Sequence, residues 1–519
     1  MQPTSAVLAA RPAVPVAVPA GAPGRRDRCY WSRLAALLAA LTVLLRLPSF
    51  ARPVWNPDEG YLAVQARLLA HGGVLYDTVV DRKPPLLPWL YQGLFAVFGD
   101  GSLWPPRTAA LLAHLATALL LAAVARRRWG DRSGAAAGAG YLLLSVGLAP
   151  EDTLAATFEV FILPWTAAAV WCADRSRWGL AGVAVAGAAL TKQTGAVILL
   201  PVAWTLWRAA RAGRAPALAG ALRLCLGFAL PVGAVALLTG PGRFLFWTVT
   251  GSAEYVSPRG AWLTGLSRAA GGASVLAVAA AGMLLAAGAA WALRRRPVPA
   301  DLWVWLAASG VAVVSGFQFY GHYFLQMVPP LVLIGVAAVR ALPRLRAAVT
   351  CWTVLACAGF LVWDLAAPSR ELDHAVAVAA AVRAHTAPDD RVLVWGIHPE
   401  TYWFADRRPA SRYLTAGFLT NFSGGRGGVR VGERYAVPGA WRAFNAEFSA
   451  HPPALVVDDS RGDPYAISRT PTLRDLLGSG YRRVARVDGA VVWAREAAGP
   501  AGRGGAHGGP AGRGAWGRW

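Results

Sequence analysis

Two charged segments near the start of the chain, WNPDEGYLAV and DRKPPLLPWL, contain side chains that could do chemistry. Asp58 and Glu59 are carboxylates that could act as a general base, or could cap the helix that follows them. Arg82 and Lys83 precede two prolines, which remove backbone donors and favour an extended chain. The segments could therefore supply a base and an anion-binding group, or only a helix cap and two side chains at a membrane surface.

Lysine is rare in this chain, although basic residues are common. Of the 51 Lys and Arg residues, only Lys83 and Lys192 are lysines. Because arginine fills the ordinary basic roles, a lysine at these two positions suggests a need for a compact ammonium group, such as a point-charge contact to phosphate. A side chain that merely reaches toward the membrane surface is the alternative interpretation of Lys83.

Further ionisable side chains occur at the ends of apolar segments. Such groups are costly at membrane depth, so each is a candidate for a functional role. A single histidine such as His322 is, however, more often a hydrogen-bonded structural residue than a ligand. The set comprises Glu151, Asp152, Glu159, Glu254, His322 and Tyr323.

The composition predicts an integral membrane protein. The chain is 55% hydrophobic and 15% charged, with a mean hydropathy of +0.40. The formal net charge of +23 would suit a nucleic-acid partner, but the arginines form short clusters between apolar segments, which is typical of topology signals. We therefore predict no nucleic-acid partner. The five cysteines have no paired or metal-type spacing and predict neither disulfides nor zinc.

The arginine clusters also predict the topology. A helix needs about 20 apolar residues to cross the hydrocarbon core, and cytoplasmic loops collect basic residues. Placing the clusters inside predicts about eleven transmembrane helices, the first over 32–50 and the second over 107–125. The chain between them must then stay outside, with two extracytoplasmic juxtamembrane helices over 60–71 and 86–99. Both charged segments become extracytoplasmic.

Four parts are expected along the chain. Residues 1–30 form a disordered cytoplasmic tail, 31–367 the transmembrane catalytic domain, 368–497 an extracytoplasmic domain, and 498–519 a disordered Gly/Arg-rich tail. In the third part, DHAVAVAAAVRAH has helical spacing, and RVLVWG, PALVVDD and YRRVARVDGAVVWA are strand-like. The predicted fold class is an α-helical polytopic membrane protein with a small α/β extracytoplasmic C-terminal domain.

An outward-facing site with carboxylates and cations suits chemistry on a lipid-linked phosphate. A carboxylate can act as the base on a hydroxyl, while a cation stabilises the departing phosphate. The contrasting class is a membrane transporter or lipid flippase, which often has an internal repeat and charges near the midplane. No convincing repeat occurs here, and the charges lie on one side. A non-catalytic envelope scaffold that binds through residues 370–497 is a third alternative.

The order of several motifs resembles the bacterial GT-C glycosyltransferases related to protein O-mannosyltransferases and lipid A aminoarabinose transferases. The motifs include DEGYLAVQARLLAHGGVLYDTVVDRKPPLLPWL, ATFEVFILPW, GAALTKQTGAVILLP and FYGHYFLQMVPPL, and the similarity covers about residues 32–345. The resemblance implies a GT-C fold in the cell membrane. It also implies an enzyme that transfers a sugar, with inversion, from a polyprenyl-phosphate donor to a cell-envelope acceptor on the extracytoplasmic side.

The resemblance assigns roles to individual residues. Asp58 is implied as the base or as part of a catalytic and metal-binding centre, and Lys83 as the group that holds the donor phosphate. Glu159 falls where relatives have a second carboxylate, although the asparagine that often precedes it is absent from ATFEVF. A divalent metal ion of unknown identity is implied as a cofactor, without assigned ligands. The predicted catalytic residues are Asp58, Glu59 and Glu159, and the predicted substrate-binding residues are Arg82, Lys83, Lys192, His322 and Tyr323.

Overall fold

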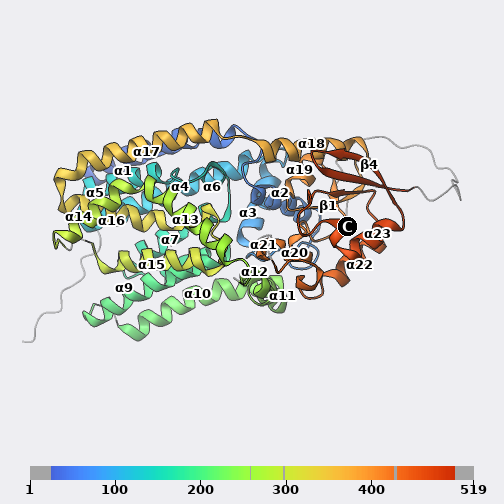
Figure 1. The fold of residues 1–519 in the computed structure, drawn as a ribbon. Coiled ribbons are helices and arrows are strands. Elements are labelled where there is room, and N and C mark those ends of the chain that lie inside the picture. The colour runs from blue at the N-terminus through green and yellow to red at the C-terminus, as the bar shows by residue number, and fades with distance from the viewer. Residues whose placement is uncertain (1–24, 215, 258, 296–297, 426–428, 497–519) are drawn as a thin grey trace, which may run out of the picture.

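The computed structural model describes residues 25–214, 216–257, 259–295, 298–425 and 429–496. Figure 1 shows a long bundle of helices with a small sheet and its helices packed against one end, which we call the capped end. Helix α1 begins at Arg25, so the last residues of the predicted N-terminal tail are helical. The rest of that tail, and the predicted C-terminal tail, lie outside the described residues.

The bundle is built from apolar helices of very different lengths. Among the described residues, five helices are long and apolar enough to cross a membrane, and α13 with α14, bent by 81° at their junction, would make a sixth. The predicted count of eleven therefore stays a prediction. The bundle helices are α1 (Arg25–Arg46), α4 (Trp104–Trp129), α5 (Asp131–Leu144), α7 (Phe158–Asp174), α8 (Trp178–Thr191), α9 (Leu199–Arg211), α10 (Ala217–Thr239), α13 (Trp262–Ala279), α14 (Ala281–Ala292), α15 (Ala300–Ser315), α16 (Val328–Ala341) and α17 (Arg346–Ala366).

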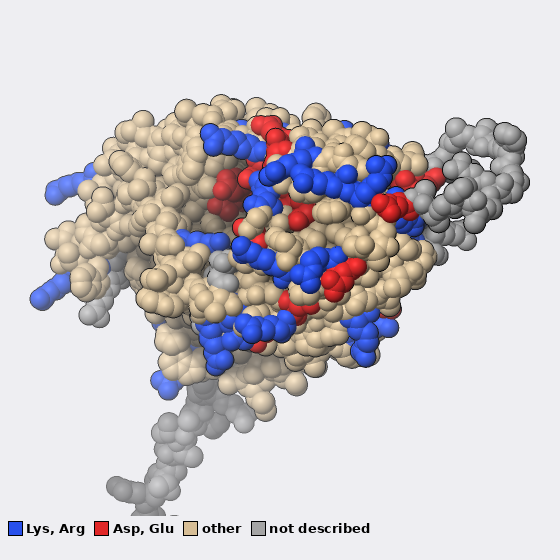
Figure 2. Space-filling model, turned by 45° about the vertical axis from the view of Figure 1, so that its right-hand side comes forward, with Lys and Arg blue, Asp and Glu red and all other residues tan. Residues whose placement is uncertain are grey.

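The outer surface of the bundle is apolar. On α10, for example, Leu218 and Leu238 are 84% and 79% exposed. A surface of this kind would aggregate in water but is matched to lipid tails. Figure 2 shows that charged side chains gather toward the capped end, while most of the visible bundle surface carries none. The structure thus agrees with the predicted membrane protein.

Helices α2 (Pro57–Ala70) and α3 (Leu86–Phe98) lie at the capped end, close to the predicted positions of the two juxtamembrane helices. Helix α2 starts three residues before the predicted Gly60, because Asn56 is its N-cap: the Asn56 Oδ1 accepts from the Asp58 N–H at 2.9 Å, and Pro57 follows. The capping role considered for Asp58 and Glu59 therefore belongs to Asn56. The Asp58 carboxylate is not needed as a cap, while Glu59 accepts from the Trp55 N–H just before the N-cap.

The C-terminal region, residues 370–496, contains the predicted helix and strands. A five-stranded sheet has the order β2-β1-β3-β5-β4, in which β1 is parallel to β2 and β3, and β5 is antiparallel to β3 and β4. The strands predicted around RVLVWG, PALVVDD and YRRVARVDGAVVWA are confirmed. Its main elements are α18 (Arg370–Ala384), β1 (Arg391–Trp395), α19 (Glu400–Ala405), β2 (Arg408–Pro409), α20 (Gly417–Thr420), α21 (Phe422–Gly425), α22 (Ala440–Ala450), β3 (Leu455–Asp458), α23 (Pro471–Gly478), β4 (Tyr481–Val487) and β5 (Ala490–Arg495).

The C-terminal region is docked tightly on α2. A Cβ atom at Gly60 would lie 2.4 Å from the Cβ of Glu400, so only glycine permits this approach of α19. Beyond it, Arg67 forms ion pairs with Asp100 at 2.6 Å and with Asp406 of the C-terminal region at 3.2 Å. Helix α2 is therefore mostly buried between the bundle and the C-terminal region.

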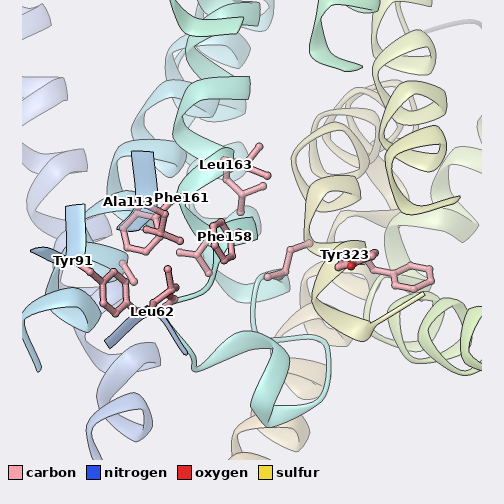
Figure 3. Close-up of a cluster of buried hydrophobic side chains, with 14 of the residues drawn as sticks. Leu62, Tyr91, Ala113, Phe158, Phe161, Leu163 and Tyr323 are labelled. Atoms are coloured by element: carbon pink, nitrogen blue, oxygen red, sulfur yellow. Dashed lines mark hydrogen bonds between the residues drawn. The ribbon is translucent and has the colours of Figure 1, made fainter. Parts of the chain in front are cut away.

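The apolar core continues from α2 and α3 into the bundle. Figure 3 shows Leu62 and Tyr91 next to Phe158 at the start of α7, with Tyr323 farther along the same layer. The Tyr91 hydroxyl donates to the Ala156 carbonyl at 2.7 Å, which fixes the entry of α7. This packing determines where the carboxylate that follows Phe158 can lie.

Candidate active site

Asp58 and Lys83 form an ion pair at the capped end. The Lys83 Nζ lies 3.0 Å from the Asp58 Oδ2 and 4.1 Å from the centroid of the Phe158 ring. The Lys83 backbone is fixed on both sides, since its N–H donates to Asp81 and its carbonyl accepts from the Tyr76 hydroxyl. Both charged side chains keep about a quarter to a third of their surface exposed, 24% for Lys83 and 32% for Asp58. They therefore remain accessible to a bound molecule.

The ion pair shifts the protonation of both partners. Burial alone would raise the pKa of Asp58, but attraction to Lys83 and His322 and the hydrogen bond from Lys83 outweigh it and lower this pKa to about 2. Burial alone would lower the pKa of Lys83, but Asp58 and Asp81 attract its charge and raise the pKa above its usual range. Both groups are thus ionised at neutral pH.

Asp81 is a third carboxylate beside Lys83. Its side chain is 5% exposed, and its Oδ2 accepts from Gln65 at 3.3 Å. Burial raises the pKa of Asp81 to about 6, with attraction to Lys83 opposing and repulsion by Asp58 adding to the rise. The Asp81 carboxyl therefore titrates near physiological pH.

Asp81→Asn should stabilise the protein at neutral and alkaline pH but hardly at acid pH. Because the folded pKa is raised from 3.8 to about 6, the carboxyl contributes stability below pH 4 that is lost as the pH rises through about 6. An amide cannot ionise, so the variant should gain up to about 3 kcal/mol at pH 8 and less than about 1 kcal/mol at pH 4. Thermal unfolding in detergent at both pH values measures this, with the exposed Asp475→Asn as the unchanged control. An equal gain at both pH values would contradict the titration of Asp81.

Glu159 and Lys192 form a second ion pair, from α7 and the end of α8. Glu159 is fully buried, and the Lys192 Nζ lies 3.7 Å from the centroid of the Tyr323 ring. The His322 Nε2 is 4.0 Å from the second Glu159 oxygen, and the His322 Nδ1 lies 3.0 Å from Asp152. The predicted residues Glu159, Lys192, His322 and Tyr323 therefore form one cluster.

The chain before His322 has an unusual backbone. Phe317 and Phe319 have φ angles of 48° and 51°, in the left-handed region that residues with a Cβ rarely adopt. Such residues each cost about 1–3 kcal/mol and collect where the surrounding structure demands one geometry. Here they lead into the 3-10 helix η4 (Gly321–Met327), which carries His322 and Tyr323.

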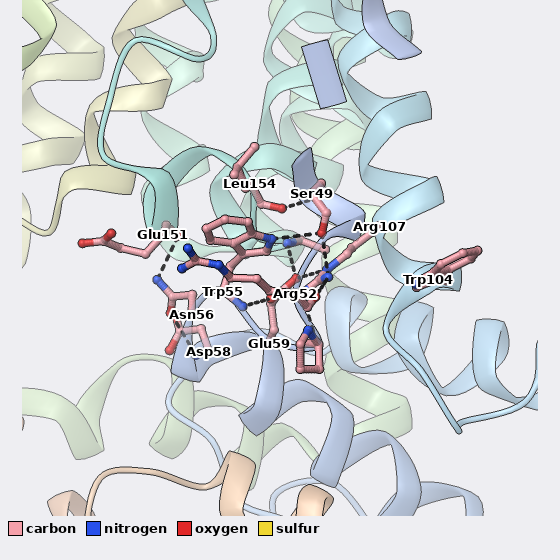
Figure 4. Close-up of polar contacts among 12 residues, drawn as sticks. Ser49, Arg52, Trp55, Asn56, Asp58, Glu59, Trp104, Arg107, Glu151 and Leu154 are labelled. Carbon is pink, nitrogen blue, oxygen red and sulfur yellow. Dashed lines mark hydrogen bonds and ion pairs between the residues drawn. The ribbon is translucent and has the colours of Figure 1, made fainter. Parts of the chain in front are cut away.

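Glu59 lies in a different environment from its neighbour Asp58. Figure 4 shows that its carboxylate faces Arg107, with hydrogen bonds of 3.0 Å from Arg107 Nε to Oε1 and 2.8 Å from Nη2 to Oε2. The Trp55 and Ala156 N–H groups also donate to it, at 2.9 and 2.8 Å. Both side chains are 1% exposed or less. Both oxygens of Glu59 thus accept hydrogen bonds from protein groups and are buried, which favours a structural role over the predicted catalytic one.

Arg82 makes no ion pair among the described residues. Its guanidinium stacks between two aromatic rings, 4.9 Å from the centroid of Tyr255 and 4.5 Å from that of Phe418 in the C-terminal region. The Gln193 Nε2 donates to the Arg82 carbonyl at 2.5 Å, which ties this segment to the residue after Lys192. Arg82 therefore lies at the border between the predicted site and the C-terminal region.

Sequence reasoning missed several of these contacts. Arg107 carried a usable signal, because it is the first residue of the predicted span over 107–125, where a charge is costly unless it is paired. Tyr255 and Phe418 carried none, since nothing in their local sequence separates them from other aromatic residues. Glu254, considered as an outer carboxylate, pairs instead with Arg430 of the C-terminal region. Glu151 is exposed and contacts the site only through its backbone, whose carbonyl accepts from Asn56.

The predicted divalent metal remains a prediction. Within the described residues, no group of three His, Cys, Asp or Glu side chains is arranged to hold a metal ion. Two carboxylates of the candidate site are instead paired with lysines, Asp58 with Lys83 and Glu159 with Lys192. We derive no chemical step through a metal.

A bundle of apolar helices capped by α2, α3 and a small α/β region is the GT-C fold of membrane glycosyltransferases, as the comparisons confirm. ArnT from Cupriavidus metallidurans in the apo state matches over 90% of this chain and 98% of its own, with a TM-score of 0.59 and 18% identity. The structure of the same protein bound to undecaprenyl phosphate matches over 91% and 99%, with a TM-score of 0.56 and 18% identity.

A more distant solved structure and a family sequence model agree with this fold. The Archaeoglobus fulgidus oligosaccharyltransferase in complex with Zn and sulfate matches over 89% of this chain and 73% of its own, with a TM-score of 0.52 and 14% identity. The sequence model of the dolichyl-phosphate-mannose-protein mannosyltransferase family matches residues 82–234. No curated protein matches the chain by sequence. The resemblance inferred from the motifs is thus confirmed.

Proposed function

We propose that the protein is a membrane glycosyltransferase that moves a sugar from a polyprenyl-phosphate donor to a hydroxyl of a cell-envelope acceptor. The observation that carries the proposal is the accessible pair of Asp58 and Lys83, 3.0 Å apart, at the capped end of a GT-C fold. The ArnT structure with undecaprenyl phosphate supports this class of donor. The arginine clusters at the opposite ends of the predicted spans favour an extracytoplasmic site.

In the proposed reaction, the acceptor oxygen attacks the anomeric carbon of the donor sugar and its proton passes to Asp58. The bond between the anomeric carbon and the phosphate oxygen breaks, and its electron pair leaves with the polyprenyl phosphate. Lys83 stabilises the charge that develops on this phosphate. A single displacement of this kind inverts the configuration at the anomeric carbon.

The Asp58–Lys83 pair gives the proposed reaction an order. With a pKa of about 2, Asp58 is a weak base as long as Lys83 holds it. A phosphate that binds Lys83 competes for the same ammonium group and weakens its attraction to Asp58. The pKa of Asp58 then rises toward its ordinary value, so donor binding activates the base before the acceptor reacts.

The second cluster has a supporting role in this proposal. Lys192 offers a second cation on the donor side, and Tyr323 and His322 line the same part of the site. Glu159 holds Lys192 in place and is the second carboxylate within reach of the sugar. Arg82 borders the phosphate position without a competing carboxylate contact.

Sugar transfer by the purified protein tests the proposal. The wild type in vesicles should release polyprenyl phosphate and form a glycosidic bond when given a polyprenyl-phosphate sugar and an extract of envelope acceptors. Lys83→Ala should lower kcat/KM about 10²-fold, because the leaving phosphate loses its cation. The pKa of Asp58 should rise when Lys83 is removed. On acidification, the variant should therefore protonate its base and lose its remaining activity at a higher pH than the wild type does.

Two results would overturn the assignment. Sugar transfer at the wild-type rate by Lys83→Ala would show that Lys83 does not stabilise the leaving phosphate. Movement of a lipid or solute across the vesicle by the wild type, with no glycosidic bond formed from any polyprenyl-phosphate sugar, would favour the transporter alternative.

A further inference from the structure

Tyr255 lies at the edge of the Lys83 site, although it comes from a distant part of the chain. It belongs to α12 (Ala253–Val256), in the connection between α10 and α13. Its ring and that of Phe418 contact the Arg82 guanidinium, with centroids 4.9 and 4.5 Å from the guanidinium carbon. The stack places Tyr255 against the residue before Lys83, and the charges of both Arg82 and Lys83 act on its phenol, so Tyr255 lies at the border of the proposed phosphate position.

The hydroxyl of Tyr255 is a hydrogen-bond donor with no partner among the described residues. In the part of the chain that the structure describes, no group accepts from it or donates to it. Burial raises the pKa of Tyr255 to about 12, Tyr320 adds to the rise, and the nearby charges of Lys83 and Arg82 oppose it. The phenol is therefore neutral and protonated, close to Lys83, and able to donate to an oxyanion.

The C-terminal region holds the backbone around Tyr255. The Glu254 Oε2 accepts from the Arg430 Nε at 2.9 Å, and the Asn421 Nδ2 donates to the Glu254 carbonyl at 3.3 Å. A Cβ atom at Gly424 would lie 2.6 Å from the Tyr255 Cα, so α21 packs directly on α12. From the bundle side, the Gln318 Nε2 donates to the Tyr255 carbonyl at 3.1 Å. Both parts of the protein thus determine the position of this one residue.

We propose that Tyr255 is a further donor-binding residue whose hydroxyl donates to a phosphate oxygen held by Lys83, and that Glu254 and Arg430 are positioning residues for it. The inference rests on the proposed function for the identity of the donor. It gives the C-terminal region a part in the reaction site. A neutral phenol adds a directed hydrogen bond to the phosphate without placing a further charge beside Asp58 and Lys83.

Binding of undecaprenyl phosphate tests the role of Tyr255. Tyr255→Phe removes the hydroxyl and keeps the ring on Arg82, so its melting temperature should match the wild type while the Kd for undecaprenyl phosphate rises about tenfold. Tyr30→Phe is the matched control, since Tyr30 also stacks on an arginine, Arg126, but belongs to the start of α1 and contacts neither Tyr255 nor its positioning residues. An unchanged Kd in Tyr255→Phe would overturn the inference.

A charge swap tests the two positioning residues. Glu254→Arg and Arg430→Glu should each raise the same Kd and lower kcat, because each places like charges together and displaces α12. The double variant restores an ion pair and should recover most of the wild-type affinity, and Glu254→Arg added to Tyr255→Phe should raise the Kd no further, which a purely structural role of Glu254 would not predict. Single variants with wild-type Kd, or a double variant no better than the singles, would overturn the positioning roles.

The two proposals can fail separately. If the wild type binds undecaprenyl phosphate and Tyr255→Phe weakens this binding, the inference stands even where no sugar transfer is found. If sugar transfer is found and Tyr255→Phe binds like the wild type, the proposed function stands and the inference falls.

Discussion

Asp58→Asn is expected to lower the rate of sugar transfer about 10³-fold while donor binding persists, since the reaction loses its general base. Asparagine keeps the size of the side chain, and its carbonyl can still accept from Lys83, which lies 3.0 Å from the carboxylate. It cannot take a proton from the acceptor hydroxyl. Single-turnover transfer and undecaprenyl phosphate binding, measured on the same preparation, separate the two steps.

Asp100→Asn is a suitable comparison for this variant. Asp100 is also at the capped end and pairs with Arg67 at 2.6 Å, but it is 44% exposed and does not contact Lys83. Its variant should transfer sugar at nearly the wild-type rate. Wild-type turnover by Asp58→Asn would mean that another group takes the proton, and Glu159 would be the next residue to change.

The main elements of the fold follow from local rules of sequence. Apolar segments between arginine clusters indicated the bundle, and β-branched runs bounded by Gly, Pro and Asp indicated the strands of the C-terminal region. The start of α2 was placed too late, although Asn56 and Pro57 form an ordinary N-cap and N1 pair. The rules for helix ends, applied to Asn56 and Pro57, are thus sufficient to predict the correct start of α2.

The composition of the site was partly predictable, but its pairings were not. The rarity of lysine singled out Lys83 and Lys192, and both lie among carboxylates in the structure. Which carboxylate each one meets depends on how helices far apart in sequence pack. Tyr255 is the extreme case, because its position depends on contacts with Gln318 and with Gly424 of the C-terminal region. The chain has 13 tyrosines, and nothing in the local sequence distinguishes this one from the others.

Glu59→Gln is expected to cost about 3–5 kcal/mol of unfolding free energy. The substitution leaves the Arg107 guanidinium buried without a counter-charge, and it replaces an acceptor oxygen that now receives hydrogen bonds from Arg107 and from the backbone. Leaving the buried Arg107 charge unpaired destabilises the folded state by much more than the intact ion pair stabilises it. Unfolding of the purified protein in detergent measures the loss.

Glu371→Gln provides the contrast, because its pair with Arg461 is largely exposed, at 62% and 35%, and should cost less than about 1 kcal/mol. The same experiment distinguishes the two roles of Glu59. If Glu59 is structural, the fraction of Glu59→Gln that folds at low temperature should transfer sugar within a few-fold of the wild-type rate. A variant of normal stability that has lost transfer would instead restore Glu59 to the catalytic residues. Since Ala156, two residues before the start of α7, also donates to Glu59, the buried pair fixes the distance between the segments that carry Asp58 and Glu159.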